Sequence, residues 1–170
     1  MEILTAPYLV AAVLLATAGA TKVITPIPAA TALLKLGAGC PLWVVRLLGL
    51  VELTVAVSAF VVGGILPASA LAVLYGGLTL VALAMLRADP GAECGCFGPV
   101  PMPVSYRHVV LNLLALTTGV TAAITRTEPV DKLFVVDRWL YAPLGIAVTA
   151  GACGAFLWLT LPPTEPNNQP

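Results

Sequence analysis

The sequence predicts an all-α integral membrane protein, a bundle of about five transmembrane helices in a lipid bilayer. Of its 170 residues, 59% are hydrophobic and 9% are charged, whereas a soluble globular domain carries about 25% charged residues. Five apolar stretches reach the roughly 20 residues that a membrane-spanning helix needs. Their apolar runs are continuous and do not alternate, which favours helices over strands. The stretches are Leu4–Ile24, Trp43–Val62, Pro67–Leu86, Ser105–Thr125 and Trp139–Leu161.

The first stretch is interpreted as a retained transmembrane helix. Ala16-Thr17-Ala18 mimics the cleavage site of a secretory signal, but only Met1 and Glu2 precede the apolar run. The positively charged segment of a signal peptide is therefore missing. The formal net charge of the chain is zero and no basic run exists. This argues against nucleic acid as a partner, because such binding needs a dense Lys/Arg footprint.

The chain divides into three parts. Residues 1–125 hold the first four spans and form a four-helix core, and 126–161 hold a connector and the fifth span. The polar, proline-rich tail 162–170 is expected to be disordered. The connector between the first two spans is too long for a turn, and its middle, Ala29–Leu36, is expected to form a short interfacial helix.

Small residues indicate where the first and fifth spans pack closely, because helices in lipid approach each other where side chains are small. The first span offers Ala12, Ala16 and Ala20 on one face. The fifth offers Gly151 with Ala155 and Ala150 with Gly154. Cys153 lies among these positions, and we expect it to be a buried free thiol that acts as a small hydrophobic side chain.

Two of the four cysteines lie in the connector before the fourth span, in Cys94-Gly95-Cys96-Phe97-Gly98. Five spans place this connector, the first connector with Cys40, and the tail on one face, here called the cysteine face. Positive charges on the two faces give a tie under the positive-inside rule, or one slightly against an extracytoplasmic cysteine face. We expect the cysteine face to be extracytoplasmic, because paired thiols persist as disulfides only in an oxidising compartment.

Two thiols one residue apart indicate thiol redox chemistry or metal capture. A bond between Cys94 and Cys96 would close a small, strained ring, and strained exposed disulfides are the labile, oxidising ones. Alternatively, Cys40 acts as a resolving thiol or forms a structural disulfide with one of them, and the sequence does not choose among these pairings. A metal site with Cys40, Cys94, Cys96 and His108 is disfavoured, because paired zinc ligands are normally two to four residues apart. Redox exchange without a metal is the prediction.

Glu52 lies about 13 Å into the second span at 1.5 Å per residue. A carboxylate at that depth is costly and is a functional candidate by default. Lys22 and Arg46 lie in the same half of the bundle, so the three residues form a candidate intramembrane charge cluster. The cluster is either a structural ion pair between the first two helices, a proton carrier, or a hydrogen-bond partner for a bound quinone.

His108 and Asn112 are four residues apart, and therefore on one face of the fourth span, just below the cysteine connector. They are a candidate proton relay, and the imidazole could also activate a thiol. The neighbouring Arg107 is expected to be an anchor whose charged end reaches the membrane interface.

Three stretches together resemble the MauE branch of the DoxX-like membrane proteins. They are Ala18-Gly19-Ala20-Thr21-Lys22, Arg46-Leu47-Leu48-Gly49-Leu50-Val51-Glu52 and Cys94-Gly95-Cys96-Phe97-Gly98. The resemblance covers about the first 125 residues, and its motif carries over to Lys22, Glu52, Cys94 and Cys96. Cys40 and Cys153 match no pattern of the family.

The resemblance implies a bacterial inner-membrane protein that supports disulfide formation or maturation of extracytoplasmic proteins with a thioredoxin-like partner. MauE itself serves maturation of methylamine dehydrogenase. By analogy with other membrane disulfide machinery, a quinone is a candidate electron acceptor, although no sequence feature points to one. The predicted function is thus a membrane thiol–disulfide redox protein, a component of an oxidoreductase system. The alternatives are a non-enzymatic assembly factor with a structural disulfide, and a carrier of a metal or small solute.

Overall fold

A computed structural model describes residues 5–89, 93–97, 103–126 and 141–160. Within these ranges the chain is helical apart from its connections and one isolated antiparallel bridge between Glu93 and Pro103. The helices described are α1 (Thr5–Ile24), α2 (Ile27–Lys35), α3 (Leu42–Val61), α4 (Ile65–Ala88), α5 (Tyr106–Thr125) and α7 (Tyr141–Thr160). The connector before α7 and the tail that we expected to be disordered lie outside the described residues.

Four of these helices, α1, α3, α4 and α5, are long and apolar enough to cross a membrane. Large apolar side chains such as Leu66 and Leu80 lie on the outside, at 83% and 70% exposure. Such a surface is suited to lipid and not to water. The predicted all-α membrane bundle is therefore confirmed. The described apolar part of α7, Gly145–Thr160, is shorter, so a fifth crossing stays a prediction.

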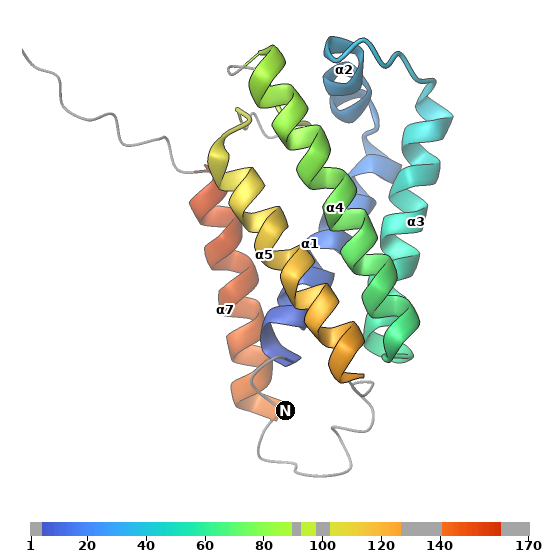
Figure 1. Cartoon of the computed structure of the whole chain (residues 1–170). Coiled ribbons are helices and arrows are strands. Elements are labelled where there is room, and N and C mark those ends of the chain that lie inside the picture. The colour runs from blue at the N-terminus through green and yellow to red at the C-terminus, as the bar shows by residue number, and fades with distance from the viewer. Residues whose placement is uncertain (1–4, 90–92, 98–102, 127–140, 161–170) are drawn as a thin grey trace, which may run out of the picture.

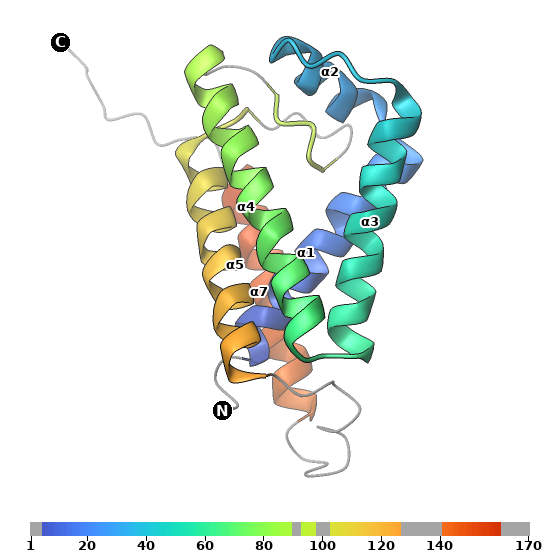
Figure 2. The same ribbon diagram turned by 45° about the vertical axis from the view of Figure 1, so that its right-hand side comes forward.

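The long helices stand side by side, and α2 lies across one end of the bundle (Figure 1). The start of α5, the end of α7 and the described part of the cysteine connector gather at that same end (Figure 2). The short helix predicted over Ala29–Leu36 is present as α2, and its interfacial position stays a prediction. It begins at Ile27, earlier than predicted, because Pro28 suits the first turn of a helix. The structure thus brings the first and third connectors together at the end here called the cysteine end.

The core lies between α1 and the helices around it. α1 packs most extensively against α3, and α4 against α5, while α7 lies along α1. One cluster of buried side chains joins α1, α3, α4 and α5, and it includes Leu15, Ala56, Leu71, Tyr75 and Ala115. The hydroxyl of Tyr75 donates a hydrogen bond of 2.7 Å to the carbonyl oxygen of Ala11, which ties α4 to α1 within this core.

The small residues of α1 and α7 are used differently from the sequence prediction. Ala12 is fully buried, but Ala16 and Ala20 are only half-buried. In α7, Gly151 lies against the side chain of Val10, so that a Cβ there would come within 2.9 Å of it. Ala150 and Gly154 face outward.

The expectation of a buried Cys153 is wrong, because its side chain is exposed. The physical reason is helical geometry. Cys153 lies two residues beyond Gly151, about 200° around the helix at 100° per residue. It therefore points away from the face of α7 that contacts α1.

Candidate functional site

Lys22 and Glu52 form a buried ion pair between α1 and α3. The Lys22 Nζ atom donates to both carboxylate oxygens of Glu52, at 3.0 Å to Oε1 and 2.7 Å to Oε2. Lys22 is 4% exposed and Glu52 is fully buried. Both Glu52 oxygens thus have a charged donor, which is the condition for holding a carboxylate inside a membrane bundle.

Two glycines place this ion pair. Gly19 and Gly49 face each other where α1 and α3 approach most closely, and a Cβ on either would lie 2.7 Å from the carbonyl oxygen of the other. Lys22 and Glu52 each follow their glycine by three residues, so both side chains start next to this close contact, here called the α1–α3 seam. Neither glycine was predicted from the sequence as a packing position. The repeated Gly-x-x-charge spacing in the two helices is the signal that could have found them.

Arg46 does not join this pair, although the sequence suggested a cluster of all three charges. Its side chain is exposed on α3, and no ion pair between Arg46 and Glu52 is present in the part of the chain that the structure describes. Arg46 and Glu52 are six residues apart, which is about 120° around a helix at 100° per residue. They consequently lie on different faces of α3.

The cysteine loop, residues 93–97, is held over the bundle by three helices. The hydroxyl of Thr21 on α1 donates a hydrogen bond of 3.3 Å to the carbonyl oxygen of Cys96. Phe97 packs edge-to-face on Phe156 of α7, with ring centroids 5.8 Å apart. Gly95 lies against the backbone of Pro28, at the start of α2. The loop is therefore packed against α1, α2 and α7.

Gly95 could not be another residue without a rearrangement. Its φ of +63° is in the left-handed region, which side chains disfavour. A Cβ would also lie 2.6 Å from the carbonyl carbon and oxygen of Pro28. Glycine is required here both for its conformation and for its lack of volume, and it sets the positions of the cysteines on either side.

Cys94 and Cys96 are joined in a disulfide, with their Cα atoms 5.3 Å apart. Cys94 is buried, and Cys96 is half-buried. Cys40 is a free thiol in the connector between α2 and α3, at the cysteine end. The alternative in which Cys40 forms a permanent bond with one of the loop cysteines is thus not the arrangement observed.

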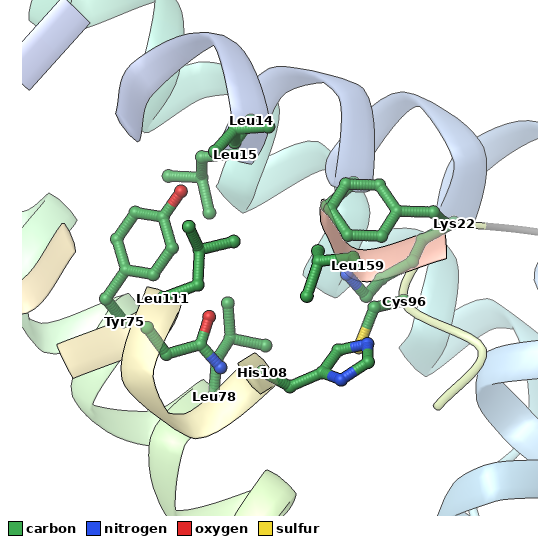
Figure 3. A pocket seen from close by; sticks show the side chains of 12 residues that line it. Leu14, Leu15, Lys22, Tyr75, Leu78, Cys96, His108, Leu111 and Leu159 are labelled. Carbon is green, nitrogen blue, oxygen red and sulfur yellow. The ribbon is translucent and has the colours of Figure 1, made fainter. Parts of the chain in front are cut away.

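A small cavity beneath the loop collects several of the predicted site residues (Figure 3). Its volume is about 30 Å³, and a water molecule needs roughly 10–15 Å³ of such space. The cavity is therefore large enough to hold water. Its polar lining comes from Lys22, Tyr75, Cys96, His108 and Asn112; its apolar lining comes from Leu14, Leu15, Ala18, Leu78, Phe97, Leu111 and Leu159.

His108 is fixed by the start of its own helix. The backbone N–H of Ser105 donates to its Nδ1 atom at 3.3 Å, and the Ser105 hydroxyl is 3.1 Å from the same atom. The Ser105 hydroxyl also accepts a hydrogen bond from the backbone N–H of His108, the third residue of α5. The two contacts form a capping box, which satisfies backbone groups that a helix start leaves unpaired. The imidazole is 4% exposed, and the cap orients it into the bundle.

The structure thus brings the predicted proton relay and the cysteine loop together, since Asn112 and His108 line the same cavity as Cys96.

Arg107, expected to be an interfacial anchor, reaches α7. One guanidinium nitrogen donates to the carbonyl oxygen of Trp158 at 3.1 Å, and the guanidinium lies 5.8 Å from the centre of the Trp158 ring. This contact holds the end of α7 beside the loop.

Fold and site together define a multi-pass helical membrane protein with a disulfide loop packed over a small, mostly apolar cavity that several polar side chains also line. The family model described as methylamine utilisation protein MauE matches residues 2–125, so the chain belongs to the MauE family. The resemblance to MauE is therefore confirmed, and the wider DoxX-like relationship stays a prediction. Searches of curated proteins and of solved structures found no match. The matched residues include every residue of the site except those on α7.

Proposed function

We propose that this protein is a thiol–disulfide redox component of a bacterial inner membrane. Residues 1–125 form its working core, and the cysteine end faces the extracytoplasmic side. The observation that carries the proposal is the Cys94–Cys96 disulfide, held on a fitted loop directly above a cavity with polar side chains. A purely structural disulfide has no need of such a cavity.

The reaction that fits is dithiol–disulfide exchange with a reduced thioredoxin-like protein. A thiolate of that partner attacks one sulfur of the loop, forms a mixed disulfide and releases the other loop sulfur as a thiolate. The partner's second thiolate then attacks the mixed disulfide. The partner leaves oxidised, with one disulfide, and the loop is left with two thiols. The family description, methylamine utilisation protein, favours clients that serve methylamine utilisation. Maturation of methylamine dehydrogenase is the particular role that the resemblance to MauE implies.

A quinone is the candidate acceptor for the electrons of the reduced loop, but the cavity beneath the loop is too small to hold one. A cavity of about 150 Å³ is what benzene occupies in a protein core, whereas this one measures about 30 Å³. A quinone would have to bind elsewhere, for example from the lipid side.

A non-enzymatic assembly factor is the competing function, and the tight fit of Gly95 against Pro28 favours it, because it gives the loop one fixed shape. Trapping separates the two. Cys94→Ser and Cys96→Ser are expressed singly in cells, and the membranes are examined for mixed disulfides by non-reducing electrophoresis and mass spectrometry. A redox protein accumulates a mixed disulfide in one variant and loses function in both. If neither variant traps a partner and both keep function, the redox proposal is wrong.

Sidedness has a separate test, because Cys40 is a free thiol at the cysteine end. In a Cys153→Ser background, a membrane-impermeant maleimide applied to intact spheroplasts should label Cys40. Labelling only after the membrane is opened would place the cysteine end in the cytoplasm and contradict the proposed orientation.

A further inference from the structure

His108 carries a buried hydrogen-bond donor that has no partner. Within the described residues, only two buried side-chain polar atoms lack one, the hydroxyl of Tyr8 and Nε2 of His108. A buried donor without a partner loses the hydrogen bonds that water would give it, so a group left in this state calls for an explanation. Tyr8 is not part of the cavity lining, whereas His108 is.

The cap identifies which ring nitrogen holds the proton. A backbone N–H can only donate, so the Ser105 N–H requires a lone pair on Nδ1 of His108. The proton of the neutral ring is therefore on Nε2. The capping box thus sets the tautomer and leaves an N–H donor on the side of the ring away from Ser105.

The cavity brings this donor to one of the two loop sulfurs. His108 and Cys96 both line it, and Cys94 does not. Figure 3 shows the imidazole with its outer edge toward the Cys96 side chain. The titratable groups around the cavity are Lys22 on α1, Tyr75 on α4 and His108 on α5, with Glu52 on α3 behind Lys22.

The cavity has three other donors. The Lys22 ammonium gives two of its three N–H groups to the carboxylate oxygens of Glu52, the Tyr75 hydroxyl donates to Ala11, and the Asn112 amide lies deeper on the same face of α5 as His108. In the structure, the closed disulfide presents no charged acceptor to Nε2–H. Opening the disulfide would create one, because the sulfur released by attack is a thiolate.

We propose that His108 Nε2–H is the hydrogen-bond donor that stabilises the Cys96 thiolate, either directly or through a water in the cavity. The inference rests on the proposed redox function. The incoming partner thiolate bonds to Cys94 and the Cys94–Cys96 bond breaks. Its electron pair stays on Cys96, and no proton is transferred in this step. Cys96 is then the leaving sulfur, and in the reverse direction it is the attacking thiolate.

The test measures the ionisation of each loop thiol without any partner protein. Two single-cysteine proteins are made, one keeping only Cys96 and one keeping only Cys94, with serine at the other cysteine positions. Each is purified with and without His108→Leu, and the rate of alkylation by iodoacetamide is followed against pH. The pH of half-maximal rate is compared, because it does not depend on how accessible the thiol is.

Removal of His108 should raise the half-maximal pH of Cys96 by about one unit or more, since hydrogen bonds to charged groups are worth about 1.5–3 kcal/mol. The half-maximal pH of Cys94 should not move. An unchanged Cys96 profile would overturn the proposal. Equal shifts at both cysteines would also overturn it, because they would show a general disturbance of the loop.

Ser105→Ala is the matched control for the helix cap. It removes the hydroxyl contact to His108 but keeps the backbone N–H that fixes Nδ1, so the half-maximal pH of Cys96 should be the same as with Ser105 in place. A shift as large as that of His108→Leu would attribute the effect to the cap and sink the proposal. Because no partner takes part, this test and the trapping experiment can fail independently. A negative result here would rule out His108 as the donor, and a negative result in trapping would rule out the redox function.

Discussion

The Lys22–Glu52 pair and the His108–Cys96 cavity both place polar groups inside the cysteine-end half of the bundle, but they treat them differently. Every polar atom of the first has its partner, in a seam so close that two glycines face each other. The second keeps a buried donor unpaired beside a space that can hold water. Burial alone therefore does not mark a reactive site. The difference lies in whether the buried groups are satisfied.

This contrast assigns separate roles to residues that the sequence placed together as functional candidates. The lysine and glutamate, bonded to each other, stabilise one arrangement of α1 and α3, and both oxygens of Glu52 are already hydrogen-bonded. An imidazole with an unused N–H retains the capacity to bind a group that forms during a reaction. The four changes below test this separation, from the largest expected effect to the smallest.

Lys22→Met should destabilise the protein most. It leaves the carboxylate of Glu52 fully buried without its partner, and breaking a buried pair in this way costs about 3–5 kcal/mol. Unfolding by sodium dodecyl sulfate in mixed micelles measures the loss. The double variant Lys22→Met/Glu52→Leu should recover much of the stability, and the exposed Arg46→Met should change it by less than about 0.5 kcal/mol. Equal stability of Lys22→Met and the unmodified protein would show that the pair is not structural.

Gly49→Ala should have the next largest effect, because its Cβ would lie 2.7 Å from the carbonyl oxygen of Gly19. Overpacking of this kind costs about 1–3 kcal/mol, and it should separate Lys22 from Glu52 as well. The matched control is Gly76→Ala on α4, where no atom lies within 4 Å of the added Cβ. The control should be neutral or slightly stabilising, because alanine is the better helix former. The same micelle titration compares them, and equal losses in both would contradict the close seam.

Gly95→Ala should disturb the cavity region while leaving the ion pair intact. The substitution combines a positive φ with a clash against Pro28, so the loop must lift from α2, and the disulfide should be reduced several-fold faster by dithiothreitol. Gly37→Ala is the control: its φ is +78° but its surroundings are open. It therefore carries only the conformational cost, of about 1 kcal/mol. Unchanged reduction kinetics in Gly95→Ala would mean that the contact with α2 does not hold the loop.

Phe156→Ala should have the smallest effect. It removes the aromatic contact between α7 and Phe97, a pair worth about 0.5–1.5 kcal/mol. Cys96, in a protein lacking the other cysteines, should become modestly more accessible to a bulky maleimide. Leu157→Ala, on the exposed side of α7, is the control and should leave labelling unchanged. If the two variants label alike, α7 does not cover the loop.

Most of the fold could be predicted from the sequence, because the length of an apolar stretch is a local property. Spans such as Trp43–Val62 and Ser105–Thr125 were predicted within a residue or two of α3 and α5, since a helix in lipid must satisfy its own backbone over the bilayer thickness. The shared face of Cys40 and the cysteine loop followed from counting spans. Burial of individual side chains was less predictable, as Cys153 shows, because it depends on which face a neighbouring helix covers.

For this protein, the sequence by itself determined the membrane class, the MauE resemblance and the residue types of the site, because composition, span length and motif spacing can be read without a partner helix. Only the tertiary structure decided how they combine. It paired Lys22 with Glu52 and left Arg46 outside, joined Cys94 to Cys96, and set His108 beside Cys96 with an unused donor. These outcomes depend on the rotation and closeness of helices far apart in sequence, which the contacts at Gly19, Gly49 and Gly95 fix in space.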